Sequence, residues 1–177
     1  MIYIVRDGLT KDEQNKIVVG RRNIDLSESA KADLQKIAKK LKDINIDYVY
    51  SSPLIRSKQT IDIILPDSQI KFDDRLNERK LGQLEGKEIL DMKKLPLWKL
   101  SNQSRWGCEK LSDVNRRTLS FIKEKLLLFK NTNKNILIVT NNSVISCIRA
   151  YFEGKTENHT KYFISHSDLI SYPNKIK

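Results

Sequence analysis

The sequence predicts a single α/β domain in which helices cover both faces of a central, mostly parallel sheet. Two observations carry this prediction. Short apolar runs rich in β-branched and aromatic residues occur at 2–5, 47–52 and 136–139, as in strands buried inside a sheet. Amphipathic helical patterns alternate with these runs, and such an alternation is typical of a parallel sheet covered on both sides. At 177 residues the chain has the size of one domain.

The helices are predicted from the spacing of apolar residues. The first covers 27–43, with Ser27 as its N-cap. The second covers 53–64, where a proline suits the first turn because it lacks an N–H. The longest helical pattern spans 111–130, and a shorter helix is expected at 143–151.

Two other stretches have a different character. Residues 11–25 are polar and contain a glycine, which indicates an irregular loop. Residues 162–172 are expected to close the chain with a pair of edge strands.

Charge and cysteine content narrow the function classes. Lys and Arg number 33 against 22 Asp and Glu, a net charge of +11. The lysines are spread over amphipathic patterns rather than clustered with aromatics, so we expect a solvated basic surface and no nucleic-acid site. No apolar run reaches membrane-spanning length and no signal-peptide pattern occurs, so we expect no membrane association and a cytoplasmic location. Cys108 and Cys147 lack metal-ligand spacing, so we expect buried or bystander thiols and no metal site.

Polar residues follow the first strand at the place where α/β proteins bind ligands. Arg6 and Asp7 come directly after the run at 2–5, and Gly8 allows the backbone to turn sharply. In open α/β sheets, ligands bind at the carboxyl ends of the strands. We therefore expect Arg6 and Asp7 at the functional site.

Four ordered motifs resemble those of the histidine phosphatase (phosphoglycerate-mutase-like) superfamily. They are IYIVRDGLT, YSSPLIRSKQT, DDRLNERKLGQLEGKE and the Thr-Asn-Asn that follows the strand at 136–139. The resemblance covers nearly the whole chain and implies a three-layer αβα sandwich. It also implies that 87–110 is an insertion over the pocket, of the kind that sets substrate choice. The segment contains Trp98 and Trp106, and a purely structural role of these two tryptophans would leave the same sequence pattern as a segment that sets substrate choice.

The resemblance also implies roles for individual residues. The superfamily has a nucleophilic histidine at position 7 and a second histidine at position 141, where this sequence has Asp7 and Asn141. Glu78 matches the general acid that protonates the leaving oxygen. The residues implied to bind phosphate are Arg6, Asn15, Arg21 and Arg56. The two histidines of the sequence, His159 and His166, lie outside the motifs, and we do not expect either to replace the nucleophile.

The replacement at position 7 changes the chemistry most. A carboxylate is ionised at pH 7, and about 4 Å from a phosphate charge it is repelled by roughly 4 kcal/mol at an effective dielectric of 20. Arg6 and Arg56 would offset this repulsion in part. Asn141 keeps a neutral hydrogen-bond donor, so this second replacement weakens the site less.

Three functions remain open from the sequence. The first is a pseudoenzyme without phosphatase or mutase turnover, whose arginine-lined pocket binds a small phosphorylated molecule or another anion for regulation. The second is an enzyme in which Asp7 acts as nucleophile or base on a small phosphorylated metabolite, with Mg²⁺ shielding the charge. The third is a partner-binding module with a vestigial pocket. Apart from Mg²⁺ in the second case, no cofactor is expected.

Overall fold

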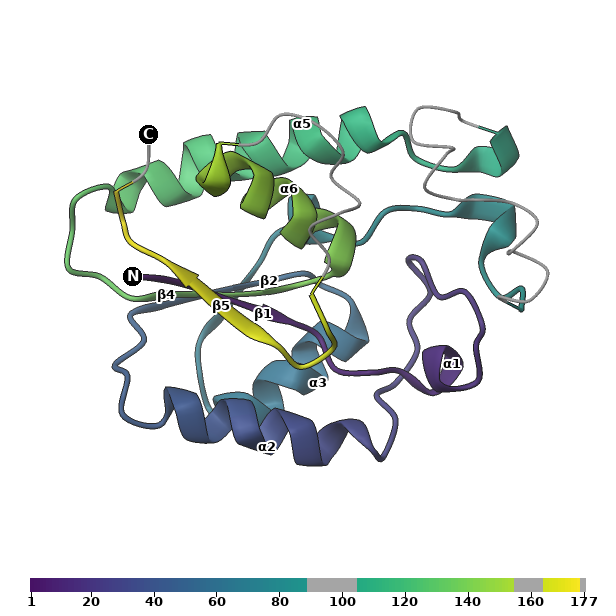
Figure 1. The fold of residues 1–177 in the computed structure, drawn as a ribbon, viewed down its shortest axis with the longest axis horizontal. Helices are drawn as coiled ribbons and strands as arrows, with labels where there is room; N and C mark the ends of the chain where they lie inside the picture. The colour runs from purple at the N-terminus through teal and green to yellow at the C-terminus, as the bar shows by residue number, and fades with distance from the viewer. Residues whose placement is uncertain (89–104, 155–163, 176–177) are drawn as a thin grey trace.

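The computed structural model describes residues 1–88, 105–154 and 164–175, which form a five-stranded sheet between helical layers (Figure 1). The strands are β1 (Ile2–Arg6), β2 (Tyr48–Ser51), β3 (Ile70–Phe72), β4 (Ile136–Thr140) and β5 (Leu169–Tyr172). Their order across the sheet is β3-β2-β4-β1-β5. Only β5 is antiparallel to its neighbour, so the predicted mostly parallel sheet is confirmed for the described residues.

The strand predictions differ from the structure at the two edges of the sheet. β3 was not predicted, because its three residues, Ile70–Phe72, are largely exposed at an edge and form no apolar run. The predicted pair of strands at 162–172 is a single strand, β5, in the part that the structure describes. Residues 162 and 163 lie outside the described ranges.

Helices cover both faces of the sheet, which confirms the three-layer αβα sandwich (Figure 1). On one face lie α2 (Ala30–Leu41) and α3 (Ile55–Ile64), and on the other lie α5 (Leu111–Phe121) and α6 (Asn142–Glu153). Successive side chains of the central strands point to opposite faces. Ile2 and Ile4 of β1 therefore enter the core under α5 and α6, whereas Val5 enters the core under α2 and α3.

The helix on 27–43 starts later than predicted. Its N-cap is Ser29, whose side chain makes no capping hydrogen bond. Ser27 instead belongs to the preceding loop, because its backbone N–H donates to the carbonyl of Leu9 at 2.8 Å. The helix on 53–64 likewise begins at Ile55, two residues after the proline.

The long pattern at 111–130 is helical but not one regular α-helix. After α5 ends, the chain makes a π-helical turn at Ile122–Leu126 and a 3-10 turn at Leu127–Phe129. Apolar side chains from both turns remain buried. The changes of pitch therefore keep the apolar face on the sheet.

The predicted loop at 11–25 contains a short helix, α1 (Lys11–Gln14). A capping box holds its first turn, because Thr10 accepts a hydrogen bond from the backbone of Glu13 while the Glu13 side chain accepts one from the backbone of Thr10. The spacing Thr-x-x-Glu is visible in the sequence and is a known helix start. The prediction of a wholly irregular loop was wrong.

Most of the predicted insertion at 87–110, including Trp98, lies outside the described ranges. Its described end forms a 3-10 turn at Arg105–Gly107, and Trp106 packs with Val18, Leu84 and Cys108 in a small apolar cluster. Further 3-10 turns lie at Asp74–Leu76 and Gly82–Leu84. That the insertion covers the pocket stays a prediction.

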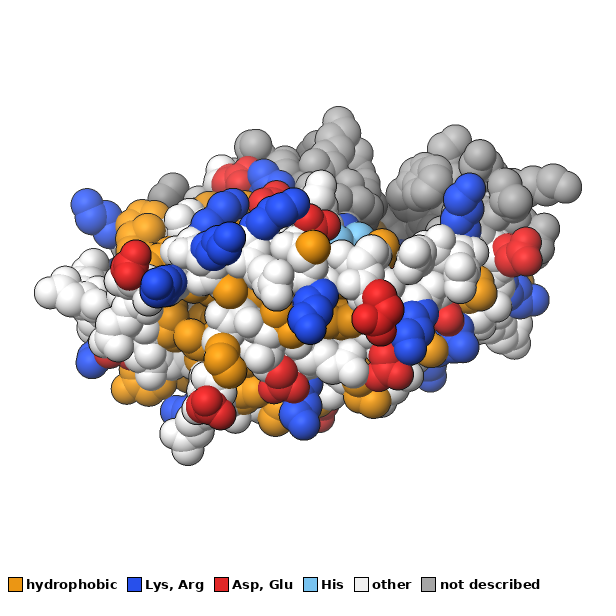
Figure 2. Space-filling model, turned by 90° about the horizontal axis from the view of Figure 1, so that it is seen from below, with side chains coloured by type: hydrophobic (Ala, Val, Ile, Leu, Met, Phe, Trp, Pro, Cys, Tyr) orange, Lys and Arg blue, Asp and Glu red, His pale blue; other side chains and the backbone are white. Residues whose placement is uncertain are grey.

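The surface mixes charges of both signs. On the face seen in Figure 2, Lys and Arg side chains are interspersed with Asp and Glu side chains, and apolar side chains lie between them. None of the helices in the described ranges combines the length and the apolar run needed to cross a bilayer.

Phe121 offers a direct test of the core beneath α5. Its side chain is fully buried and meets the Tyr50 ring edge-on, with 5.4 Å between centroids. We expect Phe121→Ala to lower the free energy of unfolding by about 3–5 kcal/mol, because it leaves a cavity. Leu128→Ala, which changes an exposed side chain in the same helical stretch, is the matched control and should change the free energy of unfolding by less than about 0.5 kcal/mol. Urea denaturation measures both, and equal effects would contradict the packing described.

Candidate functional site

The carboxyl ends of β1 and β4 bring polar residues together at one edge of the sheet. Arg6 lies opposite Thr140 in the parallel register, and the Asp7 N–H donates to the Thr140 carbonyl at 3.1 Å. Asn141 follows as the N-cap residue of α6. Its Nδ2 donates to Oδ2 of Asp7 at 2.5 Å. The two positions singled out in the sequence, Asp7 and Asn141, are therefore in direct contact.

Arg56, from the first turn of α3, completes this contact. Its Nε donates to Oδ2 of Asp7 at 2.6 Å, and the two side chains are only 5% and 3% exposed. Its two terminal nitrogens donate to the carbonyls of Arg22 and Gly20 at 3.1 and 2.9 Å. Every nitrogen of the Arg56 guanidinium thus already has an acceptor from the protein, which fixes its orientation.

The loop that receives Arg56 is shaped by a close approach at Gly20. This glycine has a φ of +55°, and a Cβ there would collide with the carboxylate of Glu85. Glu85 accepts hydrogen bonds from the backbone N–H groups of Arg21 at 3.2 Å and Leu81 at 2.7 Å. A glycine at this position allows the loop to pass close enough for its carbonyl to meet Arg56.

The charge of Asp7 is set by its burial and by two arginines. The residue is 2% exposed. Burial raises the pKa of its carboxyl, while the positive charges of Arg56 and then Arg6 act in the opposite direction. An ionised Asp7 neutralises Arg56 within the protein, and its Oδ2 already accepts two hydrogen bonds.

Arg6 is held by the segment that precedes β5. Its Nη1 donates to the carbonyl of Ile164 at 2.6 Å, and its Nη2 lies 2.7 Å from Nε2 of His166. Glu13 lies 3.7 Å from the same Nη2 and 3.3 Å from Nε2 of His166. The imidazole also reaches Asp7, since its Nδ1 is 3.2 Å from the Asp7 carbonyl oxygen.

His166 therefore lies at the site, although the sequence places it outside the four motifs. The reason is the antiparallel pairing of β5 with β1, in which Val5 is opposite Leu169. Residues just before β5 consequently return beside residues just after β1. The side chain is 24% exposed, so it contacts both the site and solvent. His159 lies outside the described ranges.

Glu13 carries a clear electrostatic signature of this contact. Burial raises the pKa of its carboxyl, but hydrogen bonds from His166 and Thr10 outweigh burial and lower the pKa to about 2. Glu13 thus links the capping box of α1 to the imidazole beside Asp7.

Comparison with known families agrees with this geometry. The profile of the histidine phosphatase superfamily (branch 1) matches residues 2–171. The chain belongs to this superfamily. The match runs through all four motifs and through β5, so it includes every element that contributes to the contacts around Asp7.

Related proteins of the superfamily carry phosphatase names. The chain is 27% identical over 154 residues to probable phosphatase C1687.21 of Schizosaccharomyces pombe, which covers 85% of this chain and 72% of that protein. It is 36% identical over 100 residues to fructose-2,6-bisphosphatase TIGAR of Bos taurus, covering 52% of this chain but only 37% of that protein. The crystal structure of the alpha-ribazole phosphatase from Shigella flexneri superimposes with a TM-score of 0.83 at 22% identity, covering 99% of this chain and 92% of that chain. At that identity the structural likeness shows the fold.

Three other residues implied by the superfamily motifs have different partners. Arg21 donates through Nε to the carbonyl of Glu78 at 2.7 Å and through Nη2 to Glu109 at 3.0 Å. Glu78 is half-buried, and its carboxylate accepts from the backbone N–H of Arg79 at 2.7 Å. Asn15 is exposed at the C-terminal end of α1. The roles of Glu78 as acid and of Asn15 and Arg21 as phosphate ligands stay predictions.

Glu109 organises a second charge cluster that the sequence analysis missed. Its carboxylate accepts from Arg21, from Nε of Arg117 at 2.8 Å and from the backbone N–H of Lys80 at 3.2 Å. Burial raises the pKa of Glu109, and the hydrogen bond from Arg117 reverses the shift, so that the pKa is lowered overall. Arg117 also donates to the carbonyl of Glu78 at 3.2 Å, so the cluster fixes the backbone beside the predicted acid.

The cysteines and the α5 surface lie outside this cluster of contacts. Both Cys108 and Cys147 are buried free thiols, as predicted, and burial raises the pKa of Cys147 to about 12. In the described ranges no group of three or more His, Cys, Asp or Glu side chains is arranged to hold a metal ion.

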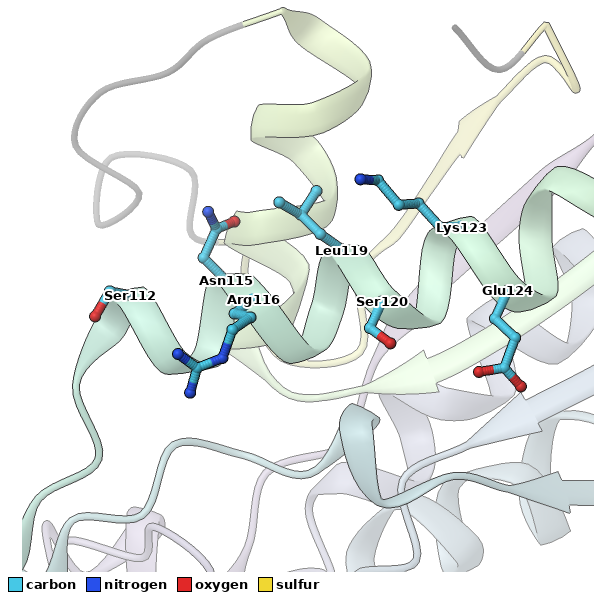
Figure 3. Close-up of a pocket in the computed structure, with 7 residues that line it drawn as sticks. All are labelled: Ser112, Asn115, Arg116, Leu119, Ser120, Lys123 and Glu124. Atoms are coloured by element: carbon cyan, nitrogen blue, oxygen red, sulfur yellow. The ribbon is translucent and has the colours of Figure 1, made fainter.

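A shallow groove runs along α5 and the turn after it, and Figure 3 shows its lining side chains emerging from successive helical turns. None of these lining residues belongs to the site at β1 and β4.

The low pKa of Glu13 predicts a pH-dependent contribution to stability. Its value of about 2 lies below the ordinary 4.5, so ionised Glu13 stabilises the fold above about pH 4.5 and this contribution disappears as the pH falls toward 2. A shift of this size corresponds to at most about 3 kcal/mol. We expect urea denaturation to show a shallower loss of stability in acid for Glu13→Gln than for the wild type. Asp33→Asn, which removes an exposed carboxylate, should follow the wild type, and an unchanged acid profile in Glu13→Gln would refute the assignment.

Proposed function

We propose that this protein is a histidine-phosphatase-fold pseudoenzyme that binds a small phosphorylated molecule or another oxyanion at Arg56, Arg6 and Asn141. The observation that carries the proposal is the buried contact of Asp7 with Arg56 and Asn141. At the position where the superfamily motif has its nucleophile, this chain has a carboxylate paired with the cation expected to hold the phosphate.

The state of Asp7 argues against phosphoryl transfer to this residue. A nucleophile needs an accessible lone pair. Oδ2 of Asp7 accepts two short hydrogen bonds, and the residue is 2% exposed. An ionised carboxylate also repels an approaching phosphate. Both features favour loss of turnover over a new role of Asp7 as nucleophile.

The surroundings still favour an oxyanion. Arg56 and Arg6 bring two permanent positive charges near Asp7, as their effect on its carboxyl shows. α6 is a helix of 12 residues that begins at Asn142, and the N-terminus of a helix attracts negative charge. A ligand has to compete with Asp7 for Arg56, so we expect weak binding.

A second candidate is hydrolysis of a small phosphorylated metabolite, and His166 is the observation that favours it. The imidazole touches the Asp7 backbone, lies 3.3 Å from the Glu13 carboxylate and is partly exposed. A carboxylate beside an imidazole is a common arrangement for a general base. The phosphatase names of the related proteins point the same way.

Turnover measurements separate these two functions. We expect the wild type to hydrolyse a panel of phosphomonoesters, with and without Mg²⁺, far more slowly than the roughly 1 per second typical of enzymes. Asp7→His combined with Asn141→His should raise the rate, because Arg6, Arg56 and Glu78 remain. Asp7→Asn removes the charge without supplying a nucleophile and should stay at background. Turnover of the wild type at enzymatic rates, lost in Asp7→Asn or in His166→Gln, would instead establish the second candidate.

Anion binding tests whether the site is still in use. We expect calorimetry to detect weak sulfate or phosphate binding that Arg56→Ala weakens about tenfold or more, because a charge-assisted hydrogen bond is lost. Arg56→Lys keeps a positive charge in case the alanine variant is unstable, and it should bind with intermediate affinity. Arg116→Ala, on an 80% exposed side chain, is the control. No binding by any variant would favour a partner-binding module with a vestigial pocket.

A further inference from the structure

Asp7 is a negative charge built into the oxyanion site. Its Oδ2 lies between Nε of Arg56 and Nδ2 of Asn141, the two donors offered to a ligand by α3 and by the start of α6. An external oxyanion that reaches these donors has to share them with the Asp7 carboxylate or displace it. Both anions would then lie within a few ångströms of each other in a buried place, where repulsion is strong.

We propose that an oxyanion binds at Arg56 and Asn141 only together with a proton that is taken up by Asp7, so that affinity for the anion rises as the pH falls. The proton removes the repulsion and gives the carboxyl group one O–H donor. Asp7 then no longer competes with the ligand as an anion. This inference rests on the proposed function, because it specifies how the same site is regulated.

The contacts of Asn141 are suited to such a change. Its Oδ1 is buried and has no hydrogen-bond partner among the described residues, while its Nδ2 donates to Asp7. A half-turn of the amide would present Oδ1 to the new O–H of Asp7 and turn Nδ2 toward a ligand. The site therefore already contains a hydrogen-bond acceptor for the proton that Asp7 takes up from solvent when the ligand binds.

Four other charged or titratable groups of the described residues face Asp7. They are Arg56 from α3, Arg6 from β1, Glu13 from α1 and His166 from the segment before β5. The two arginines stay charged over the accessible pH range, and Glu13 stays ionised because its pKa is about 2. Burial raises the pKa of Asp7, and the charges of Arg56 and then Arg6 oppose this shift. An imidazole also changes charge near neutral pH, so the test has to separate Asp7 from His166.

Calorimetric titration with sulfate between about pH 5.5 and 7.5 tests the proposal, because sulfate itself does not titrate in this range. We expect the affinity of the wild type to rise about tenfold for each pH unit lowered wherever Asp7 is ionised in the free protein. Titrations in two buffers of different ionisation enthalpy should show uptake of about one proton per sulfate. This measurement needs no variant.

Three variants assign the proton. At the highest pH of the series, Asp7→Asn should bind sulfate more tightly than the wild type does, and its affinity should no longer depend on pH. His166→Gln should keep the pH dependence of the wild type, and so should Asp33→Asn, which removes an exposed carboxylate. Circular dichroism confirms that each variant is folded.

The outcomes distinguish this inference from the proposed function beneath it. If the wild type binds sulfate with a constant affinity and no proton uptake, proton coupling is wrong while the oxyanion site stands. If His166→Gln loses the pH dependence and Asp7→Asn keeps it, the proton belongs to His166 and the inference is also wrong. If neither the wild type nor Asp7→Asn binds sulfate at any pH, the oxyanion site itself is refuted.

Discussion

The ion pair between Asp7 and Arg56 is the contact on which the site depends. With 2.6 Å between Oδ2 and Nε and both side chains almost fully buried, it joins the end of β1 to the start of α3. Asn141 adds the end of β4 to the same carboxylate. Removing one partner of a buried pair typically costs about 3–5 kcal/mol, because the other charge is left without compensation. The junction of three elements is therefore sensitive to the loss of either partner, and the same contact occupies the cation that a phosphate would need.

This arrangement connects the fold to the proposed loss of turnover. Parallel β1 and β4 place positions 7 and 141 next to each other, whatever side chains they carry. With Asp and Asn there, the site is electrically balanced from within the protein. The second arginine, Arg6, is only partly occupied: its terminal nitrogens contact the Ile164 carbonyl and His166, while its buried Nε has no hydrogen-bond partner among the described residues. Under the proposed function, a ligand would therefore compete with Asp7 for the donors of Arg56 and Asn141.

The sheet could be predicted from local patterns, whereas Arg56 and Asn141 were predicted as site residues from motifs that resemble those of the superfamily. Buried strands stand out as apolar runs, and residues at the ends of adjacent parallel strands must converge, which places Asp7 and Asn141 together. Arg56 followed from the motif that begins α3. His166 could not be placed in this way, because its position depends on the antiparallel register of β5 with β1, which no local pattern specifies. The Glu109 cluster likewise joins residues from four separate segments. The capping box at Thr10 and Glu13 was visible in the sequence but was not used.

In the proposed function, the Asp7 carboxylate is the internal anion of this site. The most direct measurement is a ¹³C NMR titration of the Asp7 side-chain carboxyl, carried out with and without sulfate. We expect sulfate to move the midpoint of the Asp7 titration to higher pH, because the bound anion favours the neutral carboxyl. A midpoint that stays the same while sulfate is bound would contradict it.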